Sequence, residues 1–304
     1  MTGDDGRELE PVFGKGITGL KNLGNRWGGH MRRRAYDSCY MASVMQTLFT
    51  LLPFRTRYYS STALAHFQTC DNPLPASCLE CQMLKLADGL ISGRYSHRAK
   101  APPPASTDFE VSNQPPKFQE GLRPSQFKAL IGKGHEEFAT MRQQDSEEFL
   151  QHLLTSLRQE AKRQHRSEAL EATNVASFGM EQRLQCSECK RVGYKVDAVD
   201  LASLPVEATE KDVDAEGKKL WQEVRLEECL NSLCAVEDLA DYACASCGRR
   251  VRAEKYAFPS MLSIQTDSCR STRFKTFPDL LVLHMKKFQL VNWMPTKLGG
   301  CSHL

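Results

Sequence analysis

The chain has 304 residues, 41% of them hydrophobic and 25% charged, which is enough to bury one large core or two modest ones. Its 40 basic and 37 acidic residues leave a formal net charge of only +3, so we expect no nucleic-acid partner. A basic leader with an apolar run and an uninterrupted apolar stretch of about 18 residues are both missing, so we expect no membrane partner and a cytoplasmic or nuclear location.

In chain order, the polar, glycine-punctuated residues 1–15 are predicted to form a flexible lead-in. Residues 39–52 then repeat apolar side chains at helical spacing, which predicts a helix that Pro53 ends. A second amphipathic stretch begins at Cys81, and the proline-rich residues 96–121 that follow it are predicted to form a surface loop.

The segment 145–163 gives the strongest helix signal in the chain. Asp145 is placed to cap it, Glu148 follows three residues later, and apolar residues recur on one face. Beyond Phe178 the sequence changes to β-branched and alternating stretches. We therefore predict an α+β chain with a helical part, residues 16–176, and a strand-rich part, residues 177–304.

Two C-x2-C pairs lie in the strand-rich part, Cys186 with Cys189 and Cys244 with Cys247. Four thiolates in two such pairs can close a tetrahedral zinc site that keeps no position for water, so the site would be structural. The separation between the pairs exceeds the 15 to 20 residues typical of compact zinc modules, so the intervening chain must fold back. The alternative is four reduced cysteines in a core.

A third C-x2-C pair, Cys78 with Cys81, falls in a helical segment where Cys70 is the only other thiol nearby. Because no matching pair accompanies it, we interpret these cysteines as packing residues.

Cys39 is predicted at the first turn of a helix, where the helix dipole and unpaired backbone N–H groups favour a thiolate. It is therefore a candidate nucleophile. Spacing alone leaves open a second interpretation, that Cys39 is a small buried residue of an amphipathic helix.

The flanking residues decide between these interpretations. GITGLKNLGN followed by SCYMASVMQTLF resembles the cysteine box of ubiquitin-specific proteases, which are papain-like cysteine proteases, and RQQDSEEFLQHLL resembles their second box. The paired C-x2-C motifs resemble the zinc-bearing fingers of that family, and FPDLLVLHMKKF resembles a palm strand. The stretch GLRPSQFKALIGKGHEEF is most similar to isopeptidase T, the branch that dismantles unanchored polyubiquitin. The resemblance covers most of residues 16–298.

This resemblance implies a papain-like fold with a helical thumb, β fingers that hold structural zinc, and an incomplete palm. It implies thiol-dependent cleavage of ubiquitin isopeptide and peptide bonds, with ubiquitin and polyubiquitin as partners. Cys39 takes the role of nucleophile and Asn22 that of oxyanion-hole donor, although Asn22 could also be an ordinary turn residue. Gln144 and Asp145 match positions that line the channel for the ubiquitin tail.

The sequence departs from the family pattern at the segment from Arg26 to Asp37, which separates Asn22 from Cys39. It reads either as translated intron or as a basic loop, and it should disable the oxyanion hole unless it is looped out. A second departure is the segment from Tyr256 to Cys269, which follows the second C-x2-C pair.

None of the eight histidines fits a family histidine box, and His284 is interpreted as a strand residue. The general base is therefore expected to be absent from these residues, which would form an inactive fragment. The alternative function is a non-catalytic ubiquitin-binding fragment.

Overall fold

The computed structural model describes residues 10–23, 38–98, 119, 121–167, 171–206, 210–213, 219–235, 237–256, 272–291 and 294–297. They belong to two compact units, Met1–Thr173 and Asn174–Leu304, and each unit is considered by itself. Four of the predicted features lie wholly or largely outside the described residues. These are the lead-in, the Arg26–Asp37 segment, the 96–121 loop and the segment after Tyr256.

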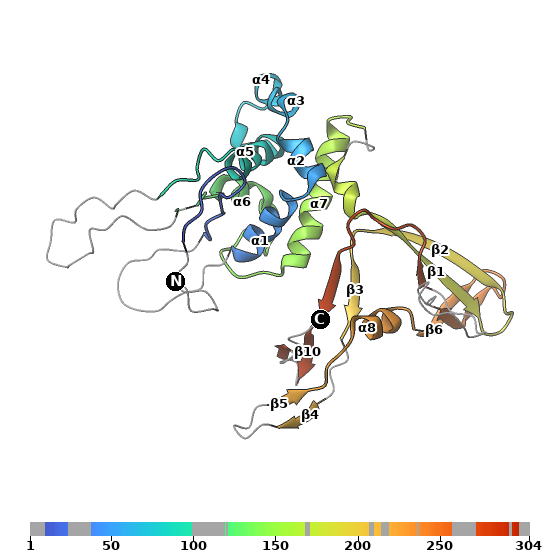
Figure 1. Ribbon diagram of the computed structural model, residues 1–304. Coiled ribbons are helices and arrows are strands. Elements are labelled where there is room, and N and C mark those ends of the chain that lie inside the picture. Colours follow the sequence, from blue (N-terminus) through green and yellow to red (C-terminus); the bar gives the residue numbers. More distant parts are fainter. Residues whose placement is uncertain are drawn as a thin grey trace. The chain divides into compact units, whose positions relative to one another are not determined.

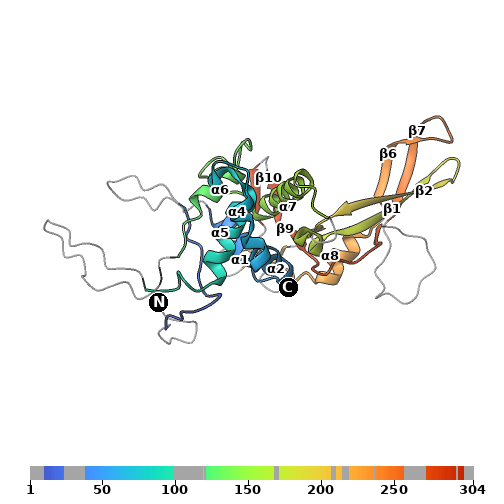
Figure 2. The same cartoon turned by 90° about the horizontal axis from the view of Figure 1, so that it is seen from above.

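The first unit is helical (Figures 1 and 2). Its helices follow in chain order as α1 (Cys39–Leu48), α2 (Leu52–Tyr58), α3 (Ser61–Leu64), α4 (His66–Thr69), the 3-10 turn η1 (Pro75–Ser77), α5 (Leu79–Ile91), α6 (Ser125–Ile131) and α7 (Ser146–Arg163). A second 3-10 turn, η3 (Ala172–Ala176), spans the boundary between the units. Helix α7 packs against α1 and α5, so the three predicted amphipathic segments of this unit pack together.

Helix α7 forms where the sequence predicted it, and Asp145 caps it. The Asp145 carboxylate accepts a hydrogen bond from the Glu147 backbone N–H at 2.7 Å, which satisfies one of the donors that a helix start leaves unpaired. Its apolar face, which includes Phe149, Leu153 and Leu157, is buried. The predicted cap and the predicted buried face are both confirmed.

The predicted role of Pro53 was wrong. Helix α1 already ends at Leu48, and Pro53 lies in the first turn of the next helix, α2. A proline is accepted there because the first backbone N–H groups of a helix have no intrahelical acceptor. The proline therefore marks a helix start.

The second unit is built on antiparallel strands, β1 (Phe178–Cys186), β2 (Val192–Val199), β6 (Glu237–Cys244), β7 (Arg249–Tyr256) and β8 (Thr272–Phe274). They form one sheet in the order β2-β1-β7-β6, in which β8 pairs with the first half of β1 and β7 with the second half. The hairpins β1-β2 and β6-β7 are the long arms labelled in Figure 2.

Shorter elements complete the second unit. They are β3 (Ala202–Pro205), β4 (Glu210–Val213), β5 (Lys219–Trp221), α8 (Leu226–Leu233), β9 (Leu283–Lys286), β10 (Phe288–Val291) and β11 (Met294–Lys297). Strands β3 and β9 pair in parallel, and a core forms around Phe178, Met180, Leu204 and Cys229. Helices and sheet together confirm the predicted α+β class.

Within the described part of the chain, none of the helices is both long and apolar enough to cross a lipid bilayer.

Candidate functional site

Cys39 is the first residue of α1, and the residue before it, Ser38, is fully buried at the helix N-cap. The helix forms here because Met41, Met45 and Leu48 fall on one face and are buried. Cys39 itself is half-buried, so its thiol is placed at a helix start with part of its surface open to solvent.

The segment that carries Asn22 is held against the same helix. The Leu20 backbone N–H donates to the Gln46 side-chain oxygen of α1 at 2.9 Å, and the Leu23 N–H donates to the Ser38 hydroxyl at 2.6 Å. On its other side the segment pairs with Leu122. Asn22 and Cys39 therefore lie on two stretches of chain that directly contact each other.

This pairing bears on the Arg26–Asp37 segment. The segment itself lies outside the described residues, but the chain on either side of it, at Leu23 and at Ser38, is joined by the 2.6 Å hydrogen bond. This bond holds the stretch that carries Asn22 beside the start of α1.

The second box, RQQDSEEFLQHLL, packs against the start of α1 through aromatic side chains. Tyr40, which follows Cys39, lies edge-on to Phe149, one turn into α7, with ring centres 5.4 Å apart. Asp145 at the start of α7 is exposed, and the half-buried Gln144 donates from its amide to the Glu137 carbonyl at 3.1 Å. The starts of α1 and α7 are thus packed together, with Cys39 on one and Asp145 on the other.

A buried lysine fixes this arrangement, and the sequence analysis missed it. Lys128 of α6 is only 4% exposed, and its ammonium group donates to the Tyr40 hydroxyl at 3.1 Å and to the Phe138 and Thr140 carbonyls at 3.1 and 2.9 Å. A buried charge is tolerated only when hydrogen bonds compensate for lost hydration. Lys128 therefore links α1, the helix that begins at Cys39, to the loop before α7.

In the second unit, the four cysteines of the two predicted pairs come together. We call Cys186, Cys189, Cys244 and Cys247 the knuckle cluster, and their sulfur atoms all lie within 4.8 Å of one another. The Cys186 and Cys247 sulfurs are 3.8 Å apart, and the Cys189 and Cys244 sulfurs 3.7 Å. Zn–S bonds of about 2.3 Å in a tetrahedron place two sulfurs about 3.8 Å apart, so the donor set fits one metal ion.

Both pairs sit in the same kind of turn. β1 ends at Cys186 and β6 ends at Cys244, and the backbone N–H four residues on, from Lys190 or Gly248, bonds back to the carbonyl of that first cysteine. Lys190 and Gly248 both have a positive φ, of 59° and 65°. Each turn therefore directs both thiols of its pair toward the other pair.

The thiols of the knuckle cluster interact strongly with one another. Backbone N–H groups of Cys247 and then Ser246 lower the pKa of Cys244 to about 7, whereas hydrogen bonding with Cys189 raises the pKa of Cys247 to about 12. Four sulfurs packed this closely share protons when no cation is bound. They could hold a metal ion, which would replace those protons.

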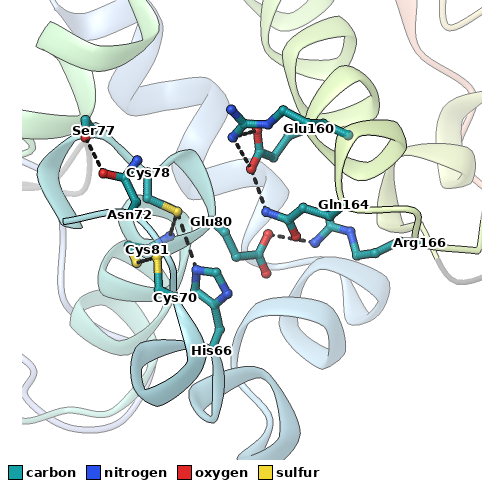
Figure 3. Close-up of polar contacts among 11 residues, drawn as sticks. His66, Cys70, Asn72, Ser77, Cys78, Glu80, Cys81, Glu160, Gln164 and Arg166 are labelled. Carbon is teal, nitrogen blue, oxygen red and sulfur yellow. Dashed lines mark hydrogen bonds and ion pairs between the residues drawn. The ribbon is translucent and has the colours of Figure 1, made fainter. Parts of the chain in front are cut away.

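Cys78 and Cys81 are buried, as the packing interpretation required, but they also meet two partners that it did not foresee. The His66 Nε2 atom lies 3.4 Å from the Cys78 sulfur, and the Cys70 and Cys81 sulfurs are 3.6 Å apart. We call His66, Cys70, Cys78 and Cys81 the His66 cluster (Figure 3).

Three of the described histidines, His284, His152 and His135, make contacts within the fold. His284 on β9 contacts the Ser203 hydroxyl of β3 at 3.3 Å, which agrees with its interpretation as a strand residue. His152 bonds the Ile131 carbonyl at 2.8 Å, and His135 stacks on Phe138. His303 lies outside the described residues.

Residues 18–300 match the protein family described as ubiquitin carboxyl-terminal hydrolase. The chain belongs to this family. Its similarity to the isopeptidase T type is confirmed by curated relatives, because it is 33% identical to ubiquitin carboxyl-terminal hydrolase 14 of Schizosaccharomyces pombe and 32% identical to ubiquitin carboxyl-terminal hydrolase 5 of Homo sapiens. The matches cover 95% and 97% of this chain.

The chain spans about a third of the length of these relatives, 32% in both cases. Among solved structures, it is similar to the SAGA Ubp8/Sgf11/Sus1/Sgf73 DUB module bound to ubiquitin aldehyde. The TM-score is 0.57 and the identity 21%, over 94% of this chain and 50% of that chain. This likeness confirms the predicted papain-like fold of the ubiquitin carboxyl-terminal hydrolase family.

Proposed function

We propose that this chain carries the nucleophile-bearing part of a thiol-dependent deubiquitinase, which cleaves ubiquitin isopeptide and peptide bonds in unanchored polyubiquitin. The observation that carries the proposal is the position of Cys39. It begins a helix in a chain that matches the family from residue 18 to residue 300, and Asn22 lies on the segment bonded to that helix start.

In this proposal the Cys39 thiolate attacks the C-terminal carbonyl carbon of ubiquitin, forms a thioester and expels a lysine amine that takes up a proton. The Asn22 amide would donate to the oxyanion, an interaction worth about 3 to 4 kcal/mol in the transition state. Gln144 and Asp145 would contact the ubiquitin tail, because they lie at the start of α7, which packs beside α1.

We assign the knuckle cluster to one structural zinc ion. Zinc fits because the sulfur spacings of 3.7 and 3.8 Å are those of a tetrahedral thiolate site. When bound, the ion would supply no chemistry at Cys39. It would tie the ends of β1 and β6 together.

Ubiquitin with a C-terminal electrophile tests the nucleophile. Such a probe has no leaving amine, so its reaction needs no general acid and depends on Cys39 and the oxyanion donor. We expect an adduct that maps to Cys39 and is lost in Cys39→Ala, and Asn22→Ala should slow its formation roughly 100-fold or more.

The same experiment separates the two functions that the sequence left open. Isopeptide-linked diubiquitin should not be turned over by these 304 residues, since none of the eight histidines fits a histidine box. An adduct at another cysteine would contradict the assignment of Cys39. Ubiquitin binding without any adduct would favour the non-catalytic ubiquitin-binding function.

A further inference from the structure

We propose that the His66 cluster is a second structural zinc site, in the helical unit, with His66 Nε2 and the thiolates of Cys70, Cys78 and Cys81 as its four ligands. All four ligand atoms lie within 4.8 Å of one another. Figure 3 shows the side chains converging on one point. Three cysteines and one histidine form a common donor set of structural zinc sites.

The distances fit this ion. Bonds of about 2.3 Å to sulfur and about 2.0 to 2.1 Å to nitrogen, at tetrahedral angles, separate sulfur from nitrogen by about 3.5 Å and sulfur from sulfur by about 3.8 Å. The His66 to Cys78 distance is 3.4 Å and the Cys70 to Cys81 distance is 3.6 Å. Two ligand pairs are therefore already at the required spacing.

The cluster is held in place by the fold around it. Cys78 is the N-cap of α5, and its sulfur accepts the Cys81 backbone N–H at 3.5 Å. Glu80, which lies between the two cysteines, points away from them toward Arg166 (Figure 3). Its carboxylate binds Arg57 and Arg166 at 2.6 and 2.8 Å. The first turn of α5 is thereby fixed with both thiols directed toward the other ligands.

A bound metal ion would stabilise residues 61–77, a segment with almost no buried apolar side chains. Within residues 61–77 only Ala63 is buried, and Leu64, Phe67 and Leu74 are exposed. The helices α3 and α4 have four residues each, too few to be stable without tertiary support. A segment with so little apolar burial needs another source of order, and metal ligation is a common one.

The other explanation for such close thiols is a disulfide between Cys70 and Cys81. A disulfide would account for two of the four groups. It would not explain why the His66 ring nitrogen lies against the buried Cys78 thiol. The cluster also adjoins a surface hollow of about 610 Å³ lined by His66, Cys70 and Cys78, which gives an ion a path to the ligands. The four-ligand arrangement therefore favours zinc over the disulfide.

Zinc content of the purified chain, measured by mass spectrometry of the element, tests the proposal. We expect two ions per chain in the parent protein, one in Cys78→Ser, one in Cys189→Ser of the knuckle cluster, and none in the double variant. The matched control is Cys234→Ser, which changes a buried cysteine outside both clusters and should leave two ions.

A second pair of variants guards against misfolding. His66→Ala should lose one ion, while His66→Cys should keep it by offering a fourth thiolate, and cobalt added to the metal-free Cys189→Ser variant should show the absorption of a tetrahedral thiolate site. One ion in the parent with none in Cys189→Ser would overturn the proposal, and so would a Cys70–Cys81 disulfide found by peptide mapping. One ion in the parent that is lost in Cys78→Ser but kept in Cys189→Ser would support this site and refute the zinc assignment of the knuckle cluster.

Discussion

The helical unit and the knuckle region are ordered by different means. The helical unit buries large side chains, among them Phe54, Tyr58 and Phe149, all of them fully buried. The core at the knuckle cluster consists of two of its own cysteines, Cys186 and Cys244, together with Val251, and its other apolar neighbours are only partly buried. Where apolar burial is extensive, polar groups adjust the positions of packed elements, and where it is thin, the proposed zinc ion would hold the chain together.

Removal of metal from the knuckle cluster should give the largest effect. Zinc binding to small sites contributes apparent free energies of about 10 to 16 kcal/mol, far more than three small buried side chains can replace. We expect Cys189→Ser to abolish hydrogen-exchange protection at the ends of β6 and β7, while α1 and α7 keep theirs. Equal loss of protection in α7 would show that the two units are not ordered independently.

The next effect concerns a polar group inside the packed unit. Lys128→Met should lower the free energy of unfolding by about 3 kcal/mol, because the Tyr40 hydroxyl and the Phe138 and Thr140 carbonyls each lose a donor. Lys85→Met is the matched control, since Lys85 makes an exposed hydrogen bond to Gln126 and should change stability by less than about 0.5 kcal/mol. Urea denaturation measures both. Equal losses in the free energy of unfolding would show that the buried hydrogen bonds of Lys128 stabilise the protein no more than the exposed one of Lys85.

The same contrast explains what could be predicted from the sequence. Helix α7 and the knuckle cluster were predictable because their signals are local, an apolar repeat with a cap at Asp145 and two C-x2-C pairs. Lys128 was not, because a lysine in an amphipathic segment reads as a surface residue, and only tertiary packing brings Tyr40 and Phe138 to it.

The His66 cluster lies between these cases. Its signal, a histidine four residues before Cys70 and a C-x2-C pair shortly after, is present in the sequence, but a C-x2-C pair without a matching second pair favours packing. The His66 spacing becomes informative only once α4 folds back onto the start of α5. The end of α1 was misjudged for a related reason, since Pro53 is compatible with a helix start as well as with a helix end.

A smaller effect is expected at the junction of Asn22 and α1. Ser38→Ala removes the acceptor of the Leu23 N–H and should cost about 1 to 3 kcal/mol of stability. Because Leu23 follows Asn22, the variant should also slow the reaction of Cys39 with electrophilic ubiquitin. Ser38→Thr keeps the hydroxyl and should restore the rate. Unchanged reactivity in Ser38→Ala would show that this bond does not set the position of Asn22.

The smallest effect separates the two roles of Asp145. As a cap, its carboxylate accepts the Glu147 N–H at 2.7 Å, and Asp145→Ala should cost about 1 kcal/mol of stability by thermal or urea denaturation. Asparagine caps helices about as well as aspartate, so Asp145→Asn should keep that stability while removing the negative charge. If Asp145 also contacts the ubiquitin tail, the asparagine variant should bind ubiquitin more weakly although it is equally stable. Equal ubiquitin affinity in Asp145→Asn and the parent, measured by calorimetry, would leave the cap as the only supported role, because a charge that contributes to binding could not be removed without loss of affinity.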